Sequence, residues 1–345
     1  MGVGSTNASQ DSGFLGLNAQ QTRQQTNENN DPVPVTWDNY TRAESDTYFQ
    51  SYVDLGGFGE FYHHRNLIPI DEQNVIQMNR DTLYSAGVFD LTEPVTITKP
   101  DTGDRYQLMI VINQDHYVTE SSTTSGEFTL TQDAIGTRYC MVVFRTFLDP
   151  EDPDDVQEAR RAQDEIAANQ DASVTTFEIP DWDQQSLKQI RDALITVGET
   201  MDNTRNTYGE ADEVNPIKHL LGTAIAWGGM PESDTLFLWR TPKQNDGDTP
   251  YTLTVDDVPV DGFWSVTVYN RNWYLEANKY DAYSINNVTA ERADDGSVTI
   301  HFGGDPDQLN FLYTPEGWSY TIRLYDPREA ILNGSYQFPK AQLVE

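Results

Sequence analysis

The sequence contains a single cysteine, Cys140, among 345 residues. One thiol excludes an internal disulfide and a metal cluster held by several thiolates. Cys140 lies in the apolar run RYCMVVF, and this context is typical of a buried structural thiol rather than a nucleophile. We therefore expect Cys140 to have a packing role.

Basic residues are also scarce, with 22 Lys and Arg, of which only six are Lys, against 55 Asp and Glu, so that the formal charge is −33. A carboxylate-rich surface repels nucleic acid and anionic lipid. The acidity could serve cation binding, or it could be adaptation to a cytoplasm full of salt. The acids are spread along the whole chain, which favours halophilic adaptation and makes any acidic cluster weak evidence for function.

Long apolar runs are missing, and stretches such as LMIVI at 108–112 are too short to span a bilayer. The first 35 residues are rich in Gln, Asn, Ser, Thr and Gly and have no basic segment followed by an apolar one. This composition predicts a disordered tail rather than a secretory signal. We expect a soluble, cytoplasmic protein with no membrane span, long enough for about two domains.

Familiar catalytic motifs are missing as well: there is no nucleophile elbow, phosphate loop, dinucleotide fingerprint or two-His zinc helix. Glu60 and His63 have the spacing of helical metal ligands, but no second such pair exists and nearby glycines oppose a helix. The acidic run at 149–155 fits helix capping better than a calcium loop. No metal site is predicted, the sequence leaves the question of a cofactor open, and an enzyme with dispersed residues stays open.

The pattern of apolar residues predicts strands, then helices, then strands. Residues 41–57 predict a first helix ended by a Gly pair, and residues 83–147 predict a series of strands. Three further helices are expected, over 149–170, 183–201 and 215–229. Strands resume at 235. We divide the chain into a disordered tail (1–35), a helix with a first β-subdomain (36–149), a helical connecting segment (150–229) and a second β-subdomain (230–345).

The two β regions share three blocks in the same order. DTLY at 81–84, DRYQLMIVINQDHYV at 104–118 and FRTFLDP at 144–150 correspond to DTLF at 234–237, DGFWSVTVYNRNWYL at 261–275 and IRLYDP at 322–327. In the middle block His116 matches Trp273 at the same offset as its neighbours. The repeat indicates internal duplication. The predicted fold is mainly β, with two related β-sandwich-like subdomains joined by an α-helical region.

These blocks also resemble a known family. NRDTLYSAGVFDLTEPVTI with GDRYQLMIVINQDHYV, followed by VDGFWSVTVYNRNWYL and YTIRLYDPREAILNGSYQFP, is similar to proteins that pair domain of unknown function 1254 with domain of unknown function 1214. The resemblance covers about 57–170 and about 240–340. It implies no established activity, and members of the family are often exported. The first motif of the family usually reads Asn, Pro, Asp, Thr, whereas Arg80 stands here in place of Pro.

The stretch NRDTLYS at 79–85 concentrates polar groups that suit either a site or a strand entrance. Asp81 could act as a general base, but the second copy keeps Asp-Thr-Leu, which favours a structural role for Asp81. The first copy has three polar residues that the second copy lacks, namely Asn79, Arg80 and Tyr84. These three are therefore candidates for ligand binding.

Arg145 and Arg323 each lie in a strand just before an aromatic residue and an Asp-Pro turn. A buried Arg must be paired or coordinate an anion. One interpretation is a clasp to Asp149 and to Asp326, and the other is ligand binding. His116, at a strand end, is the remaining candidate for a catalytic acid or base.

The preferred hypothesis is a protein that binds a small polar or anionic ligand in a cleft between the two subdomains. Recognition of the ligand would come from Arg80, Arg145, Arg271 and Arg323, and the walls from Tyr84, His116 and Trp273. One alternative is a hydrolase or lyase that uses the same cleft with His116 or Asp81 as base, and another is a structural or assembly module. The sequence leaves the oligomeric state open.

Overall fold

The structure is a computed structural model and describes residues 31–73, 75–170 and 176–344. Most of the expected tail, residues 1–30, lies outside the described residues. The end of that tail was wrongly predicted, because Val33 bridges to Trp182 and Val35 is buried. These two apolar side chains join a small core with the helices α1 (Tyr40–Asp54) and α4 (Gln184–Gly198), so the packed part of the chain begins before residue 36.

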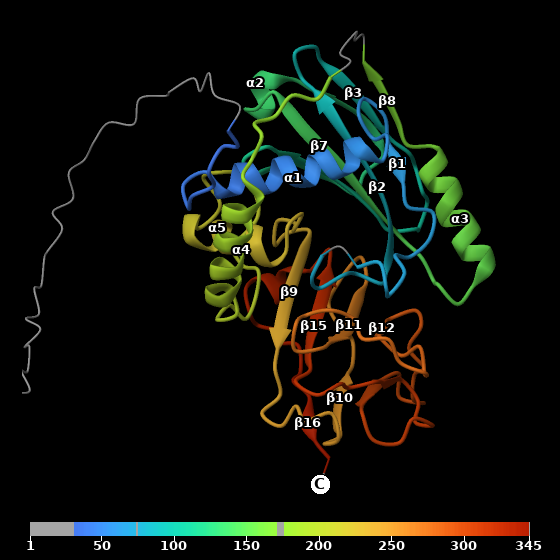
Figure 1. Ribbon diagram of the computed structural model, residues 1–345. Helices are drawn as coiled ribbons and strands as arrows, with labels where there is room; N and C mark the ends of the chain where they lie inside the picture. The colour runs from blue at the N-terminus through green and yellow to red at the C-terminus, as the bar shows by residue number, and fades with distance from the viewer. Residues whose placement is uncertain (1–30, 74, 171–175, 345) are drawn as a thin grey trace, which may run out of the picture.

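The first subdomain is built on a five-stranded antiparallel sheet in the order β1-β2-β7-β4-β5 (Figure 1). Its strands are β1 (Tyr62–His63), β2 (Thr82–Asp90), β4 (Gln107–Asn113), β5 (Val118–Ser122) and β7 (Tyr139–Phe147). The central strands are buried on both faces because each face has its own apolar cover. Leu108, Ile110 and Ile112 point to one core, whereas Met109 and Val111 point to another, as strand alternation requires.

A second, three-stranded sheet in the order β6-β3-β8 covers the latter face. It contains β3 (Val95–Lys99), β6 (Gly126–Leu130) and β8 (Ala167–Gln170). The short helix α2 (Gln132–Ile135) connects β6 with β7. The helix α1 (Tyr40–Asp54) lies across the opposite face of the larger sheet.

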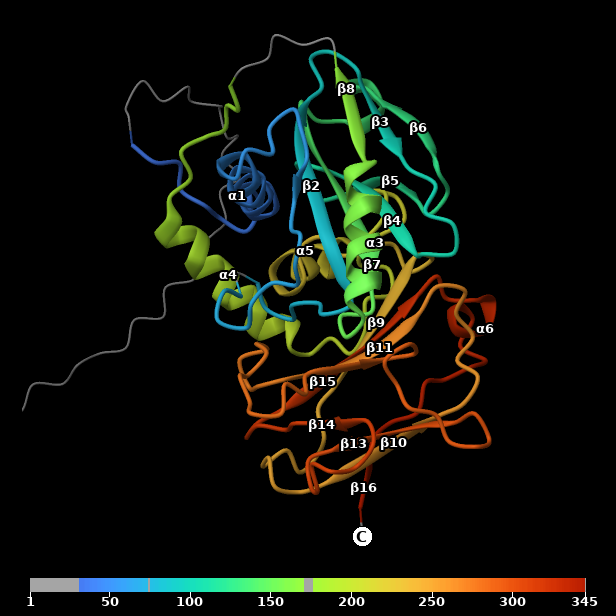
Figure 2. The ribbon, with the colours of Figure 1, turned by 90° about the vertical axis from the view of Figure 1, so that its right-hand side faces the viewer.

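The C-terminal subdomain is a sandwich of two four-stranded sheets, with orders β12-β11-β15-β9 and β14-β13-β10-β16 (Figure 2). The strands are β9 (Thr235–Arg240), β10 (Tyr251–Val255), β11 (Trp264–Tyr269), β12 (Ser284–Asn286), β13 (Val298–Phe302), β14 (Phe311–Leu312), β15 (Ser319–Tyr325) and β16 (Gln342–Leu343), and the short helix α6 (Glu329–Leu332) follows β15. One core between the sheets contains Trp318, Phe302 and Ile322, all fully buried. The prediction of a mainly β protein is thus confirmed.

The five-stranded sheet and the four-stranded sheet that contains β9 share one strand order. In the first of these sheets β2, β7, β4 and β5 lie side by side in this order, and in the other β9, β15, β11 and β12 do. Neighbouring strands are antiparallel in both sets. The turns after β4 and β11 also agree. The side chains of Asn113 and Asn270 each accept two backbone N–H bonds, and His116 and Trp273 each have φ of 63°.

The predicted helices are α1, α3 (Pro153–Asp164), α4 (Gln184–Gly198) and α5 (Pro216–Ile225), and all four are confirmed. The helix expected over 149–170 is too long, however. It ends at Asp164, and residues 167–170 form β8, which pairs with β3. Ile166 is buried in the core below β3, so tertiary packing and the free edge of β3 override the helical tendency of this segment.

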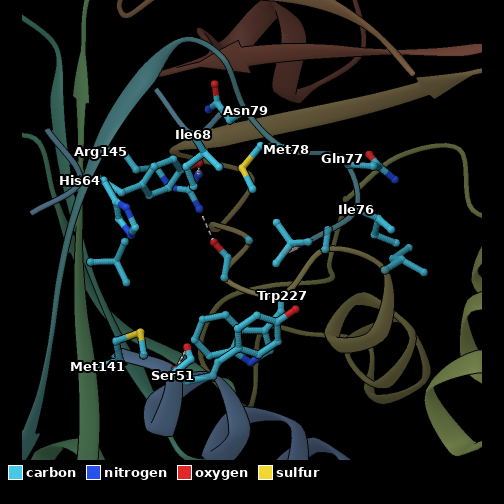
Figure 3. Close-up of a pocket in the computed structure, with 18 of the residues that line it drawn as sticks. Ser51, His64, Ile68, Ile76, Gln77, Met78, Asn79, Met141, Arg145 and Trp227 are labelled. Atoms are coloured by element: carbon cyan, nitrogen blue, oxygen red, sulfur yellow. Dashed lines mark hydrogen bonds between the residues drawn. The ribbon is translucent and has the colours of Figure 1, made fainter. Parts of the chain in front are cut away.

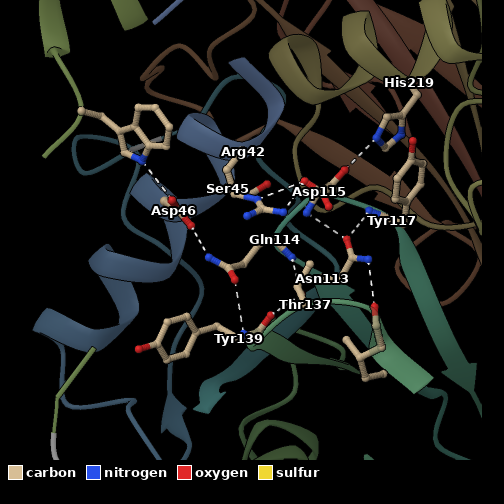
Figure 4. A network of polar contacts seen from close by, with 12 residues as sticks. Arg42, Ser45, Asp46, Asn113, Gln114, Asp115, Tyr117, Thr137, Tyr139 and His219 are labelled. Atoms are coloured by element: carbon tan, nitrogen blue, oxygen red, sulfur yellow. Dashed lines mark hydrogen bonds and ion pairs between the residues drawn. The ribbon is translucent and has the colours of Figure 1, made fainter. Parts of the chain in front are cut away.

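Polar contacts fasten α1 to the turn after β4 (Figure 4). Arg42 donates two hydrogen bonds to Asp115, and Gln114 donates one to the buried Asp46. Trp182 donates to the other oxygen of Asp46. The helix is therefore held by paired polar groups as well as by Phe49. No helix in the part of the chain described by the structure is long and apolar enough to cross a membrane.

We expect Asn113→Ala to lower the free energy of unfolding by about 2 to 3 kcal/mol, because three hydrogen bonds of its buried side chain are lost at roughly 1 kcal/mol each. Urea unfolding followed by circular dichroism measures this change. The matched control is Asn169→Ala, since the side chain of Asn169 is exposed. Equal effects of the two substitutions would contradict a structural role for the Asn113 turn.

Candidate functional site

A cavity of about 340 Å³ lies where α1, the end of α5, β2 and β7 meet β9 and β15. Figure 3 shows its walls. Much of the lining is apolar and includes Ile68, Ile76, Met78, Met141, Trp227 and Phe237. Polar groups are few, and two of them are guanidinium groups, Arg145 and Arg323. Both subdomains therefore contribute to one cavity.

Arg145 comes from the C-terminal part of β7, opposite Tyr84 of β2. It is only 8% exposed. Its Nη1 donates to the Tyr84 hydroxyl at 2.8 Å, its Nη2 donates to the carbonyl of Gly228 at 2.6 Å, and Nε is buried without an acceptor among the described residues. Within the same residues no carboxylate forms an ion pair with Arg145. The expected clasp to Asp149 is absent, because Asp149 accepts from the backbone of Glu151 instead.

Arg323 occupies the matching place in β15, opposite Phe237 of β9. The two arginines stand over matching aromatic rings, Arg145 at 5.0 Å from the Tyr84 centroid and Arg323 at 5.4 Å from that of Phe237. Arg323 donates to Thr267, to the Tyr269 hydroxyl and to the carbonyl of Gln77. These bonds replace the expected clasp to Asp326.

Asp81 supplies the negative charge near Arg323. Asp81 is 1% exposed and accepts a hydrogen bond from Asn286. Burial raises the pKa of Asp81, and the charge of Arg323 acts in the opposite direction. Asp81 is not part of the cavity lining. It therefore lies near a buried cation and outside the cavity, and this position does not favour the role of general base.

Asn79 is the member of the NRDTLYS stretch that joins Asp81 to the cavity. Its side-chain oxygen accepts from the backbone N–H of Asp81, and its amide donates to the Tyr325 hydroxyl. Asn79 and Tyr84 line the cavity, whereas Arg80 does not. Arg80 donates to the carbonyl of Ile68 and lies over the Tyr283 ring.

Arg271 and Trp273 lie away from this cavity. Arg271 is exposed and pairs with Glu316 at 2.7 Å. The carbonyl of Trp273 accepts from the N–H of Gln77, whose own carbonyl accepts from Arg323. Trp273 thus contacts the cavity wall through the backbone of Gln77.

His116 is completely buried and uses both ring nitrogens within the protein. Its Nε2 accepts from the N–H of Gly228 at 2.9 Å, so Nδ1 carries the proton and donates to the Thr223 hydroxyl at 2.8 Å. Its ring stacks on Trp227 at 5.1 Å. Burial, with His219 nearby, lowers the pKa of His116 well below its usual value. His116 fixes Gly228 by accepting from its N–H, and the carbonyl of Gly228 accepts from Arg145. His116 itself does not line the cavity.

Several cavity residues had no signal in the sequence. His64 lines the cavity, and neither ring nitrogen bonds to a described residue. Burial lowers the pKa of His64, which favours its neutral form. Tyr52 packs edge-on against it, and Tyr48 stacks on Trp227 at 4.3 Å. His64 was overlooked because its neighbour His63 completed the apparent metal spacing, and only tertiary contacts distinguish the two.

The other sequence candidates have structural surroundings. Cys140 is buried in β7, and burial raises the pKa of its thiol. His63 lies on β1 and bonds to Ser85 rather than standing on a helix. Among the described residues no group of three or more His, Cys, Asp or Glu side chains could hold a metal ion.

We expect His116→Gln to flatten the pH dependence of stability. In the folded protein His116 stays neutral below pH 6.5, whereas in the unfolded chain it binds a proton there, so acid favours unfolding. Between pH 7.5 and 5.5 the wild type should lose about 1.4 kcal/mol more stability than the variant. Urea unfolding at both pH values measures the difference. His301→Gln, on β13, is the control and should keep the wild-type slope, and a wild-type slope in His116→Gln would contradict the assignment.

Two solved structures have a similar fold. The VPA0106 protein from Vibrio parahaemolyticus has a TM-score of 0.66 and 19% identity, over 89% of this chain and 97% of that chain. An uncharacterised protein from Burkholderia cenocepacia has a TM-score of 0.53 and 16% identity, over 89% of this chain and 87% of that chain. At these identities the likeness concerns the fold alone. No curated protein matches the chain significantly.

Two family descriptions match the sequence. Residues 58–170 match "Protein of unknown function (DUF1254)", which covers the sheets of the first subdomain and α3. Residues 240–329 match "Protein of unknown function (DUF1214)", which covers most of the C-terminal sandwich. The chain therefore belongs to the proteins that pair DUF1254 on the N-terminal side with DUF1214 on the C-terminal side.

Proposed function

We propose that the cavity binds a small carboxylate with an apolar body, held by Arg145. One observation carries this proposal: in a chain with 55 acidic residues, the cavity is lined by two Arg and by no Asp or Glu. The charged groups of the lining are therefore all positive although the protein as a whole is strongly negative.

Arg145 has the donors that such a ligand needs. A guanidinium group carries five N–H donors, and two of them are used, by Tyr84 and Gly228. Those two acceptors are neutral, so the charge of Arg145 has no direct counterion among the described residues. A buried cation without a counterion is costly, and a bound carboxylate relieves that cost.

The remainder of the lining selects the body of the ligand. Aliphatic and aromatic side chains dominate the wall, and such a surface favours hydrocarbon. A volume of 340 Å³ holds on the order of ten non-hydrogen atoms if each takes about 30 Å³, the share of a water molecule in the liquid. Short aliphatic or single-ring aromatic carboxylates meet both conditions.

We also infer that the two subdomains arose by duplication. The shared strand order, the matching Asn turns and the two Arg-over-aromatic pairs support this inference. In this view the first subdomain (36–149) and the second (230–345) are copies, the helical segment (150–229) connects them, and the cavity lies where their matching arginines meet. The net charge of −33 fits an acidic, salt-adapted surface outside the cavity.

A second candidate function is a lyase or hydrolase that acts on the same carboxylate. His64 favours it, since a neutral imidazole with unbonded nitrogens can accept a proton from a ligand. In Figure 3 the His64 ring lies on the same side of the cavity as Arg145. A carboxylate held by Arg145 would then present its neighbouring carbon to a base.

We expect Arg145→Met to weaken binding of octanoate or phenylacetate by about 10- to 100-fold, because a charge-assisted hydrogen bond is worth roughly 1.5 to 3 kcal/mol. Calorimetric titration at high potassium chloride measures the affinity. The matched control is Arg271→Met, since Arg271 is exposed and lies outside the cavity. Binding of octanamide as tightly as octanoate, or equal losses in the two variants, would overturn the proposal.

Proton transfer by His64 has its own readout. We expect exchange of the C3 hydrogens of bound phenylpyruvate, which its keto group acidifies, to be accelerated in deuterium oxide, as followed by proton NMR. We expect His64→Gln to return the exchange to the rate without protein, while affinity changes less than about threefold. His63→Gln, one residue away and bonded to Ser85, is the control. An unchanged exchange rate in His64→Gln would leave binding as the function and exclude His64 as the base.

A further inference from the structure

Lys99 occupies a position where the strand pattern calls for an apolar residue. In β3 the residues Val95, Ile97 and Lys99 face inward, and Val95 and Ile97 belong to the core between the two sheets. Lys99 is 2% exposed. Lysine is rarely fully buried unless it is paired, and this chain has only six lysines.

The side chain of Lys99 lines a second cavity, of about 200 Å³, which shares no residue with the first. This cavity lies between the loop that joins β3 to β4 and Asp261–Gly262, just before β11. Its surface is mostly polar and includes the hydroxyls of Thr123 and Ser125. It therefore differs from the first cavity in chemistry as well as in place.

The amine of Lys99 has no partner within the described part of the chain, where it forms neither a hydrogen bond nor an ion pair. Burial lowers the pKa of Lys99 to about 8, and Asp101 opposes this shift. A large share of the amine is consequently neutral near pH 8, whereas an ordinary lysine of pKa about 10.4 is almost entirely protonated there. A neutral amine is nucleophilic.

The other charges of the cavity disfavour an anionic ligand. Arg105 is the second cation of the lining, but it is bound by Asp155 and Glu158. The carboxylates of Asp101, Asp104 and Asp261 belong to the lining. With hydroxyls and carboxylates as hydrogen-bond partners, the cavity suits a neutral, hydroxylated compound.

We propose that Lys99 is a reactive amine that forms an imine with a small, neutral hydroxyaldehyde or hydroxyketone in this second cavity. The Nζ lone pair attacks the carbonyl carbon and gives a carbinolamine. The carbonyl oxygen then leaves as water with the two protons of the amine, and a C=N bond replaces the C=O bond. No oxidant or reductant takes part, and the step is independent of the carboxylate site.

Reductive trapping tests this proposal on the full-length wild-type protein. The protein is incubated at pH 8 with D-glyceraldehyde and cyanoborohydride, digested, and mapped by mass spectrometry. We expect the adduct on Lys99 to form at least about tenfold faster than on each of the exposed lysines, because its fraction of free amine is larger. Lys188, Lys243, Lys279 and Lys340 are exposed and serve as internal controls.

Two further arms make the outcome decisive. Glyoxylate, a small anionic aldehyde, should label Lys99 less than glyceraldehyde does, and Lys99→Arg should remove the fast adduct while the other lysines keep their rates. Labelling of Lys99 no faster than that of Lys243, or only in denaturant, would overturn the proposal. Preference for glyoxylate would overturn the neutral ligand class.

Discussion

The hydrogen bond from the N–H of Gly228 to His116 is the contact on which the candidate site depends. Gly228 has φ of 76°, and His116 has φ of 63°, so both ends of this bond need backbone conformations that are costly for most residues. The Asn113 turn stabilises that conformation at His116. Because the carbonyl of Gly228 accepts from Arg145, the turn fixes the orientation of the guanidinium group.

A comparable chain of contacts holds Arg323. The Asn270 turn places the carbonyl of Trp273 where it accepts from Gln77, and the carbonyl of Gln77 accepts from Arg323. The Asn113 turn therefore positions Arg145 through the imidazole of His116, and the Asn270 turn positions Arg323 through the backbone carbonyl of Trp273. The arrangement gives His116 and Trp273 corresponding positions in the two sheets although their side chains have different chemistry.

Much of the fold was predictable, whereas the site was predictable only in part. Strand alternation, helical spacing and helix caps gave the mainly β class and the helices α1, α3, α4 and α5, because those signals are local. The strand β8 depends on an edge offered by β3, and α1 carries buried Glu44 and Asp46 whose partners lie far along the chain. Arg145 and Tyr84 were identified from the two sets of similar sequence blocks, but His64 enters the cavity only through tertiary packing, which no local pattern records.

The two buried arginines differ in one respect that bears on function. Asp81 lies near Arg323 without forming an ion pair, and each charge favours the ionised form of the other group. The matching residue of the second block is Asp234, whose Oδ2, like that of Asp81, is buried without a partner among the described residues. Arg323 acts on the pKa of Asp81, whereas Arg145 does not act on the pKa of Asp234. Arg145 thus keeps a buried positive charge that neutral acceptors only partly stabilise. An unbalanced cation beside an apolar cavity lowers the stability of the empty protein, and under the proposed function a bound carboxylate would recover that free energy as affinity.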